Sequence, residues 1–286
     1  MQSLSRLVAS SLLIVSSARA ASESESHYHS GKLTPYEIGP PSLLLSAKDE
    51  AQLRSGKAVM QAVVADDAQS RRLIMVQDIA TPASVVMDRI MDVDHYDRMV
   101  SGVDACVTYA SNDNGDSSGV RTVKSTYDIS ALHLKLRYFV EHTYDPSARC
   151  MTFRLDYSKR SDLDDTVGYW YVEPTGRTTC RVFYSCECQL RGWVPPPVYN
   201  VLTKEALKKA TTWVSAESLK EWKAQQERDK FGMIQFVGNV RDFVDNVKMP
   251  QLPHPPRLAV NWLDKRREAA VRFVSAVRPP QKASMS

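Results

Sequence analysis

The sequence predicts an α+β fold in which a curved antiparallel sheet with one apolar face is covered by a long C-terminal helix. Turn signals recur between stretches of alternating apolar and polar residues from Val103 to Leu190, which is typical of an antiparallel meander. Pro195-Pro196-Pro197 then interrupts the chain, because proline fits the interior of neither kind of element. From about Val198 to Gln226 the apolar residues keep helical spacing, so this helix must cover an apolar surface, and the sheet supplies one.

The first twenty residues have the composition of a targeting peptide. Arg6 provides a weak positive charge, Leu7 to Ile14 form a short apolar core, and Ala18-Arg19-Ala20 is the small-residue pattern of a cleavage site. We expect cleavage after Ala20 and entry into the secretory pathway. A mitochondrial or plastid transit peptide is the alternative, because the segment contains two arginines, several serines and no acidic residue.

The next part of the chain, residues 21–50, is predicted to be a mobile leader. It is rich in Ser, Glu, His and Pro as far as Pro41 and has no apolar period. Two apolar runs follow, Ala58 to Ala65 and Leu73 to Ile79, which predict a pair of strands. Thr81-Pro82 predicts the start of a short helix, with the threonine as N-cap and the proline in the first helical position.

Within the meander the alternation assigns side chains to two faces. In the strand from Cys180 to Leu190, the even-numbered residues are apolar and most odd-numbered ones are polar, with Phe183 as the exception. From Met151 to Tyr157 the odd-numbered residues are apolar and the even-numbered ones are polar. The five cysteines form no disulfide or zinc framework and are interpreted as packing residues.

The C-terminal residues 229–286 form a basic tail with 10 basic and 5 acidic residues. Two amphipathic helices are predicted there, Phe231 to Val247 and Leu258 to Val277. The second suits peripheral contact with an anionic membrane through residues 258–277, and packing on the domain is the alternative. Between Ala21 and Arg228 there are 25 basic and 28 acidic residues, and no nucleic-acid partner is predicted.

Three motifs in order carry a resemblance to a known superfamily. They are Ala80 to Val86 with Asp92 to Tyr96, Gly168-Tyr169-Trp170-Tyr171-Val172-Glu173-Pro174, and Leu190 to Pro195 before the last helix. In these the chain resembles the START-like, or SRPBCC, superfamily, most of all its coenzyme Q-binding START and polyketide cyclase-like branch. The likeness covers about Leu53 to Lys223. It departs after the first motif, where the superfamily usually carries Trp and Pro.

The resemblance implies the helix-grip (START/Bet v 1-like) fold over residues 51–228, with an internal apolar cavity between sheet and helix. It implies non-catalytic binding or transfer of a hydrophobic small molecule, lipid or quinone-like, without cofactor or metal. Strand parity and the resemblance together give the candidate ligand-binding residues, for which plain core packing is the alternative at each position. They are Phe153, Leu155, Trp170, Val172, Tyr184, Cys186, Leu202, Ala206, Ala210 and Trp213.

An enzyme of the polyketide cyclase/dehydrase type is the main alternative function. It would need an acid/base pair inside the cavity, and parity leaves His142 and Asp128 as candidates. No catalytic residue is predicted. His27-x-His29 is interpreted as polar filler of the leader, and the aspartates from Asp162 to Asp165 as a solvated turn.

Overall fold

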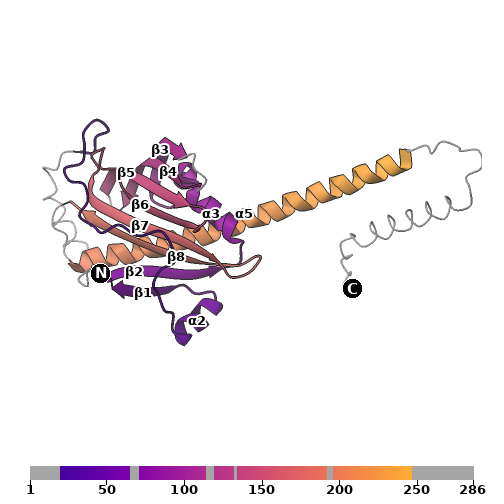
Figure 1. Cartoon of the computed structure of the whole chain (residues 1–286), viewed down its shortest axis with the longest axis horizontal. Helices are drawn as coiled ribbons and strands as arrows, with labels where there is room; N and C mark the ends of the chain where they lie inside the picture. The colour runs from indigo at the N-terminus through magenta and orange to yellow at the C-terminus, as the bar shows by residue number, and fades with distance from the viewer. Residues whose placement is uncertain (1–19, 65–70, 114–118, 132–133, 192–195, 247–286) are drawn as a thin grey trace, which may run out of the picture. The chain divides into compact units, whose positions relative to one another are not determined.

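The structure, a computed structural model, describes residues 20–64, 71–113, 119–131, 134–191 and 196–246. Eight strands form one antiparallel sheet in the order β1-β2-β8-β7-β6-β5-β4-β3 (Figure 1). The strands are β1 (Val59–Val64), β2 (Arg71–Ile79), β3 (Val103–Asp113), β4 (Arg121–Ala131), β5 (Leu134–Asp145), β6 (Cys150–Leu155), β7 (Leu163–Pro174) and β8 (Cys180–Leu190). The helices are α2 (Ala47–Arg54), α3 (Ala83–Met91), η2 (Val93–His95), α4 (Tyr96–Met99) and α5 (Pro196–Asn246).

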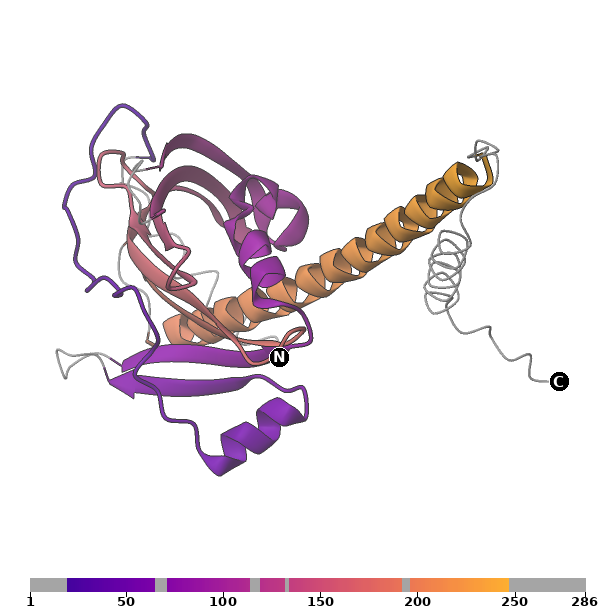
Figure 2. The ribbon, with the colours of Figure 1, turned by 45° about the vertical axis from the view of Figure 1, so that its right-hand side comes forward.

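One face of the sheet, here called the inner face, packs against α3 and the N-terminal part of α5, as Figure 2 shows. The predicted alternation along β8 is confirmed: Cys180, Val182 and Tyr184 belong to the inner cluster, whereas Phe183 belongs to a second cluster on the opposite, outer face. The predicted meander, the strand pair before it and the covering helix are all present. The fold is therefore the helix-grip arrangement that the sequence predicts.

The start of α3 differs from the prediction by one residue. Pro82 is the N-cap and Ala83 is the first helical residue, and no side chain caps this helix. Thr81 is instead fully buried, and its hydroxyl has no hydrogen-bond partner among the described residues. A threonine that is turned into the interior cannot bond to the first N–H groups of the helix.

The segment from Ala20 to Ser46, here called the leader segment, is bound to the sheet. This corrects the prediction of a mobile leader over residues 21–50. It lies along the outer face, where Ser22 forms a β-bridge with Arg160. Farther along, the Tyr36 ring stacks on that of Tyr169, with 5.6 Å between the centroids. The Tyr36 hydroxyl forms a hydrogen bond with the Ser185 hydroxyl. Backbone hydrogen bonds and a few aromatic anchors hold this segment in place, so it needs no periodic apolar pattern.

The two histidines of this segment form specific hydrogen bonds, which corrects their interpretation as polar filler. His27 and His29 each direct Nε2 at the Asp164 carbonyl oxygen, at 2.9 and 2.7 Å. The N–H groups of Lys32 and Leu33 donate to the Asp165 carboxylate, which is buried. The predicted solvated turn is therefore the docking point of the segment. Burial lowers the pKa of His27, which favours the neutral imidazole in this contact.

Helix α2 extends the cover of the outer face. Its N-terminus has a capping box between Ser46 and Asp49, which satisfies two backbone N–H groups. The Arg181 guanidinium of β8 donates to Glu50 of this helix at 2.6 Å and to Asp78 of β2 at 2.7 Å. The predicted boundary between residues 50 and 51 therefore falls inside a helix.

The chain divides into two compact units, Met1–Lys223 and Ala224–Ser286. Helix α5 runs without a break to Asn246, so the separate helix expected from Phe231 is wrong. The domain boundary expected at residue 228 stays a prediction. The second predicted tail helix, residues 258–277, lies outside the described residues. In the part of the chain that the structure covers, no helix has the length and apolarity to span a membrane.

Candidate functional site

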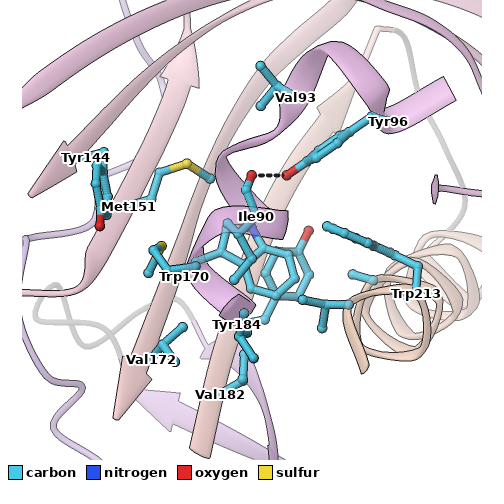
Figure 3. Packing of buried hydrophobic residues seen from close by; sticks show 14 of the residues in the cluster. Ile90, Val93, Tyr96, Tyr144, Met151, Trp170, Val172, Val182, Tyr184 and Trp213 are labelled. Atoms are coloured by element: carbon cyan, nitrogen blue, oxygen red, sulfur yellow. Dashed lines mark hydrogen bonds between the residues drawn. The ribbon is translucent and has the colours of Figure 1, made fainter. Parts of the chain in front are cut away.

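The inner face of the sheet brings together half of the predicted ligand-binding residues. Trp170 and Val172 of β7, Tyr184 of β8, and Ala210 and Trp213 of α5 all belong to the inner cluster (Figure 3). The ring centroids of Trp170 and Tyr184 are 4.0 Å apart, and those of Trp170 and Trp213 are 6.1 Å apart. An aromatic junction thus joins the sheet to the helix that covers it.

Two further predicted residues, Phe153 and Cys186, are half-buried and pack against this cluster. The Phe153 ring lies over Gly168 of the neighbouring strand, where a Cβ atom would come within 1.8 Å of ring atom Cζ. A side chain at Gly168 would therefore displace the ring. Leu155 is buried, at 1% exposed, but is not part of the inner cluster. The side chains of Leu202 and Ala206 lie outside the described residues.

A polar pair stands within this apolar interior. The Tyr127 hydroxyl of β4 lies 3.1 Å from His142 Nε2 of β5, and His142 is only 3% exposed. The other ring nitrogen, Nδ1, has no hydrogen-bond partner within the described residues. Burial lowers the pKa of His142 to about 4, so the imidazole is neutral at physiological pH.

The inner face also contains tyrosines of β4 and β5 that are not among the predicted ligand-binding residues. Tyr127 and Tyr138 are directly opposite each other in the strand register, and their rings stack with 5.2 Å between the centroids. Tyr96 of α4 contacts Trp213 of α5, at 5.0 Å between ring centroids, and donates a hydrogen bond to the Ile90 carbonyl (Figure 3). The alternation of β5 contained the signal for Tyr138, but Tyr96 reaches the interior only through tertiary packing.

Several inner side chains are deeply surrounded by protein and yet retain accessible surface. Burial raises the pKa of Tyr138, Cys186 and Cys188 above their ordinary values. All three side chains nevertheless keep an intermediate solvent exposure. Burial also raises the pKa of Tyr184, which contacts Cys186 on the same strand. Desolvation together with residual exposure is expected of side chains that line an enclosed space.

The two residues considered for acid/base chemistry do not meet. His142 lies on the inner face. Asp128 instead accepts hydrogen bonds of 2.6 and 2.8 Å from the Arg137 guanidinium. These bonds lower the pKa of the Asp128 carboxyl. Since Tyr127 points inward, its strand neighbour Asp128 points outward. Of the two candidates for the cyclase alternative, the structure therefore places only His142 in the interior, beside Tyr127.

A pocket of about 310 Å³ lies on the outer face, between the leader segment and strands β5 and β6. It is therefore not the internal cavity predicted between sheet and helix, which stays a prediction. Across the described residues, no group of three His, Cys, Asp or Glu side chains is placed to hold a metal ion. The lining residues of the outer pocket are Pro35, Tyr36, Ile38, Glu141, Thr143, Thr152, Phe153 and Arg154.

Among solved structures, the chain is similar to a START superfamily protein from Mycobacterium smegmatis, with 14% identity, a TM-score of 0.45, and coverage of 52% of this chain and 97% of that one. It is similar to a STAR-related lipid transfer protein from Xanthomonas axonopodis, with 14% identity, a TM-score of 0.44, and coverage of 62% and 97%. It is also similar to the Zhui aromatase/cyclase from Streptomyces sp. R1128, with 11% identity, a TM-score of 0.43, and coverage of 58% and 94%.

No curated protein matches the chain at a significant level. A protein family does match: the one described as polyketide cyclase / dehydrase and lipid transport, over residues 71–227. The matched region begins at β2 and ends within α5, so it contains the inner face and its covering helix. This chain therefore belongs to the polyketide cyclase / dehydrase and lipid transport family of the START-like superfamily.

Proposed function

We propose that this protein binds an apolar small molecule, lipid or quinone-like, between the inner face of the sheet and α5, and carries it without changing it chemically. The observation behind this proposal is the set of inner side chains that are desolvated yet partly accessible, namely Tyr138, Cys186 and Cys188. A ligand that buries about 300 Å² of apolar surface against such a lining would gain roughly 7 kcal/mol before association costs. That gain suffices for a carrier.

The polar pair indicates what kind of ligand fits. His142 is neutral, and its Nδ1 lacks a partner among the described side chains, so a ligand oxygen in reach of it would remove the penalty of an unpaired polar atom. The inner cluster is made of apolar and aromatic side chains, one of which, Tyr127, contacts the neutral His142. An ion would lose its hydration against such a lining, whereas an uncharged ligand would not. We therefore propose a neutral amphiphile with a carbonyl or hydroxyl group as the ligand.

A cyclase or dehydrase activity is the second candidate function. The hydrogen bond between Tyr127 and His142 favours it, because these groups could exchange a proton with a bound substrate. Burial acts against it by lowering the pKa of His142 to about 4 and raising that of Tyr127 well above its ordinary value. Both groups are thus far from the range that suits a general acid or base at neutral pH.

Native mass spectrometry of the chain beginning at Ala21, combined with lipid extraction, tests the carrier proposal. Stoichiometric co-purified apolar molecule is the expected result. The variant Cys186→Phe should reduce its occupancy by about tenfold, because the added ring takes the space of the ligand. Val107→Phe is the matched control, since Val107 is 58% exposed. Equal occupancy in both variants, or turnover of a polyketide by a chain without bound lipid, would overturn the proposal.

Peripheral membrane contact through residues 258–277 is a separate proposal that rests on the sequence. Liposome flotation of the full chain and of a chain ending at Asn246, which keeps α5 complete, tests it with vesicles containing phosphatidylserine. Loss of flotation on truncation is expected. Equal flotation of the two chains would contradict it.

A further inference from the structure

The leader segment contacts an acidic side chain through the residue that would begin the processed chain. The Ala21 backbone nitrogen donates to Asp162 Oδ1 at 2.8 Å. The sequence independently predicts cleavage after Ala20. We propose that this cleavage turns the Ala21 nitrogen into an N-terminal ammonium that forms an ion pair with Asp162 and fastens the processed chain to the outer face.

The surroundings already hold the Ala21 nitrogen in position. Ser22 donates to the Arg160 carbonyl at 2.8 Å, and the Arg160 N–H donates back to the Ser22 carbonyl at 2.9 Å. The second carboxylate oxygen of Asp162 accepts the Arg137 N–H at 2.8 Å. The carboxylate is thus oriented by the sheet on one side and faces the Ala21 nitrogen on the other.

Among the described residues, no ion pair joins the Asp162 carboxylate to a Lys or Arg side chain. Two arginines of neighbouring segments pair with other carboxylates: the guanidinium of Arg160 forms an ion pair with Glu25, and that of Arg137 forms one with Asp128. The segment itself adds further negative charge through Glu25 and Glu23. A positive terminus at Ala21 would give the Asp162 carboxylate a counter-ion.

The chemical step is hydrolysis of the peptide bond between Ala20 and Ala21 by a peptidase that cleaves after small residues. Water supplies the hydroxyl to the Ala20 carbonyl carbon and a proton to the Ala21 nitrogen, which takes up a second proton at neutral pH. Cleavage removes the hydrogen bond from Arg160 Nε to the Ala20 carbonyl, at 3.0 Å. It replaces a hydrogen bond between a neutral N–H group and the Asp162 carboxylate with an ion pair in which both partners carry a charge.

N-terminal sequencing of the protein from its native source is the first test, and Ala21 is the expected first residue. A start elsewhere would overturn the proposal. The second test compares three chains: one beginning at Ala21, one with a single glycine added before it, and the Ala21 chain carrying Asp162→Asn. NMR titration of the terminal amine should give a pKa clearly above the ordinary value of about 8 only in the first chain.

Urea unfolding supplies the stability readout. Because the pKa of the amine is raised in the folded state, the added stability is present below pH 8 and is lost as the pH rises through the folded-state pKa. We expect the folding equilibrium constant of the Ala21 chain to exceed that of the Asp162→Asn variant by about threefold at pH 6, as for a partly exposed ion pair, and the gap to narrow above pH 9. Glu25→Gln is the matched control, because it removes a carboxylate from the same segment without touching Ala21. An amine with an ordinary pKa, or one that responds equally to both substitutions, contradicts the proposal.

Discussion

Acidification should destabilise this protein through His142, by an amount that follows from its burial. The pKa of an ordinary histidine is 6.5, and burial lowers that of His142 to about 4. The unfolded chain therefore binds a proton at a pH where the folded chain does not. Each tenfold difference in proton affinity corresponds to about 1.4 kcal/mol, so the free energy of unfolding should fall by roughly 3 kcal/mol between pH 6.5 and pH 4.

The assay is urea denaturation at several pH values between 7.5 and 4, on the native chain and on His142→Phe. The variant keeps a ring at this position but cannot take up a proton, so the titration of all other groups is common to both proteins. The difference between the two curves isolates His142. His95→Gln is the matched control, because His95 is exposed and pairs with Asp92 at the surface.

We expect the stability of the native chain relative to the variant to fall progressively below pH 6.5, by roughly 3 kcal/mol at pH 4. Two parallel curves would show that His142 is not held neutral in the interior. The proposal of a neutral, unpartnered Nδ1 as a ligand contact would then fail with it.

Three substitutions test the packing of the two faces. Gly168→Ala should destabilise the fold by about 1–3 kcal/mol through the forced movement of Phe153; the loss in urea denaturation should shrink when Phe153→Leu is added, and strictly additive losses would contradict the clash. Trp213→Ala should lower the free energy of unfolding by about 3–5 kcal/mol in the same measurement. Its control is Phe231→Ala, at a residue that is 76% exposed, which should change that free energy by less than about 0.5 kcal/mol. Similar losses in the two variants would refute the inward placement of Trp213. Arg181→Met should speed amide hydrogen exchange in α2 and leave β5 unchanged, because its guanidinium joins that helix to the sheet; unchanged exchange in α2 would show that the ion pairs do not hold it.

The sheet and its inner face could be predicted because the alternation of apolar and polar residues is a local property of the sequence. Alternation along β8 placed Val182 and Tyr184 on one side and Phe183 on the other, and the structure agrees. Alternation reports which face a side chain takes, but not its neighbour on the next strand. The contact between Tyr127 and His142 depends on the register of β4 and β5, which the sequence pattern alone did not define.

The leader segment was missed because its contacts are with residues far away in the sequence. Ala21 meets Asp162, and Tyr36 meets Ser185, across more than one hundred residues in each case. Such contacts leave no periodic pattern in the segment itself, and its polar composition is typical of a mobile chain. The length of α5 was underestimated for a different reason: the change of charge near Asp229 is not a helix breaker, and no proline lies between Pro197 and Pro250.

The elements that cover the outer face limit how far the chain can be shortened at its N-terminus for expression. The family match starts at Arg71, but a fragment that starts there would lose β1, α2 and the leader segment, residues 20–46. Strand β2 would become an open edge, and the apolar patch around Ile74, Tyr169 and Phe183 would face water. Open edges and apolar patches of this kind promote aggregation. The smallest piece worth expressing therefore begins about fifty residues ahead of the recognisable family sequence, at Ala21.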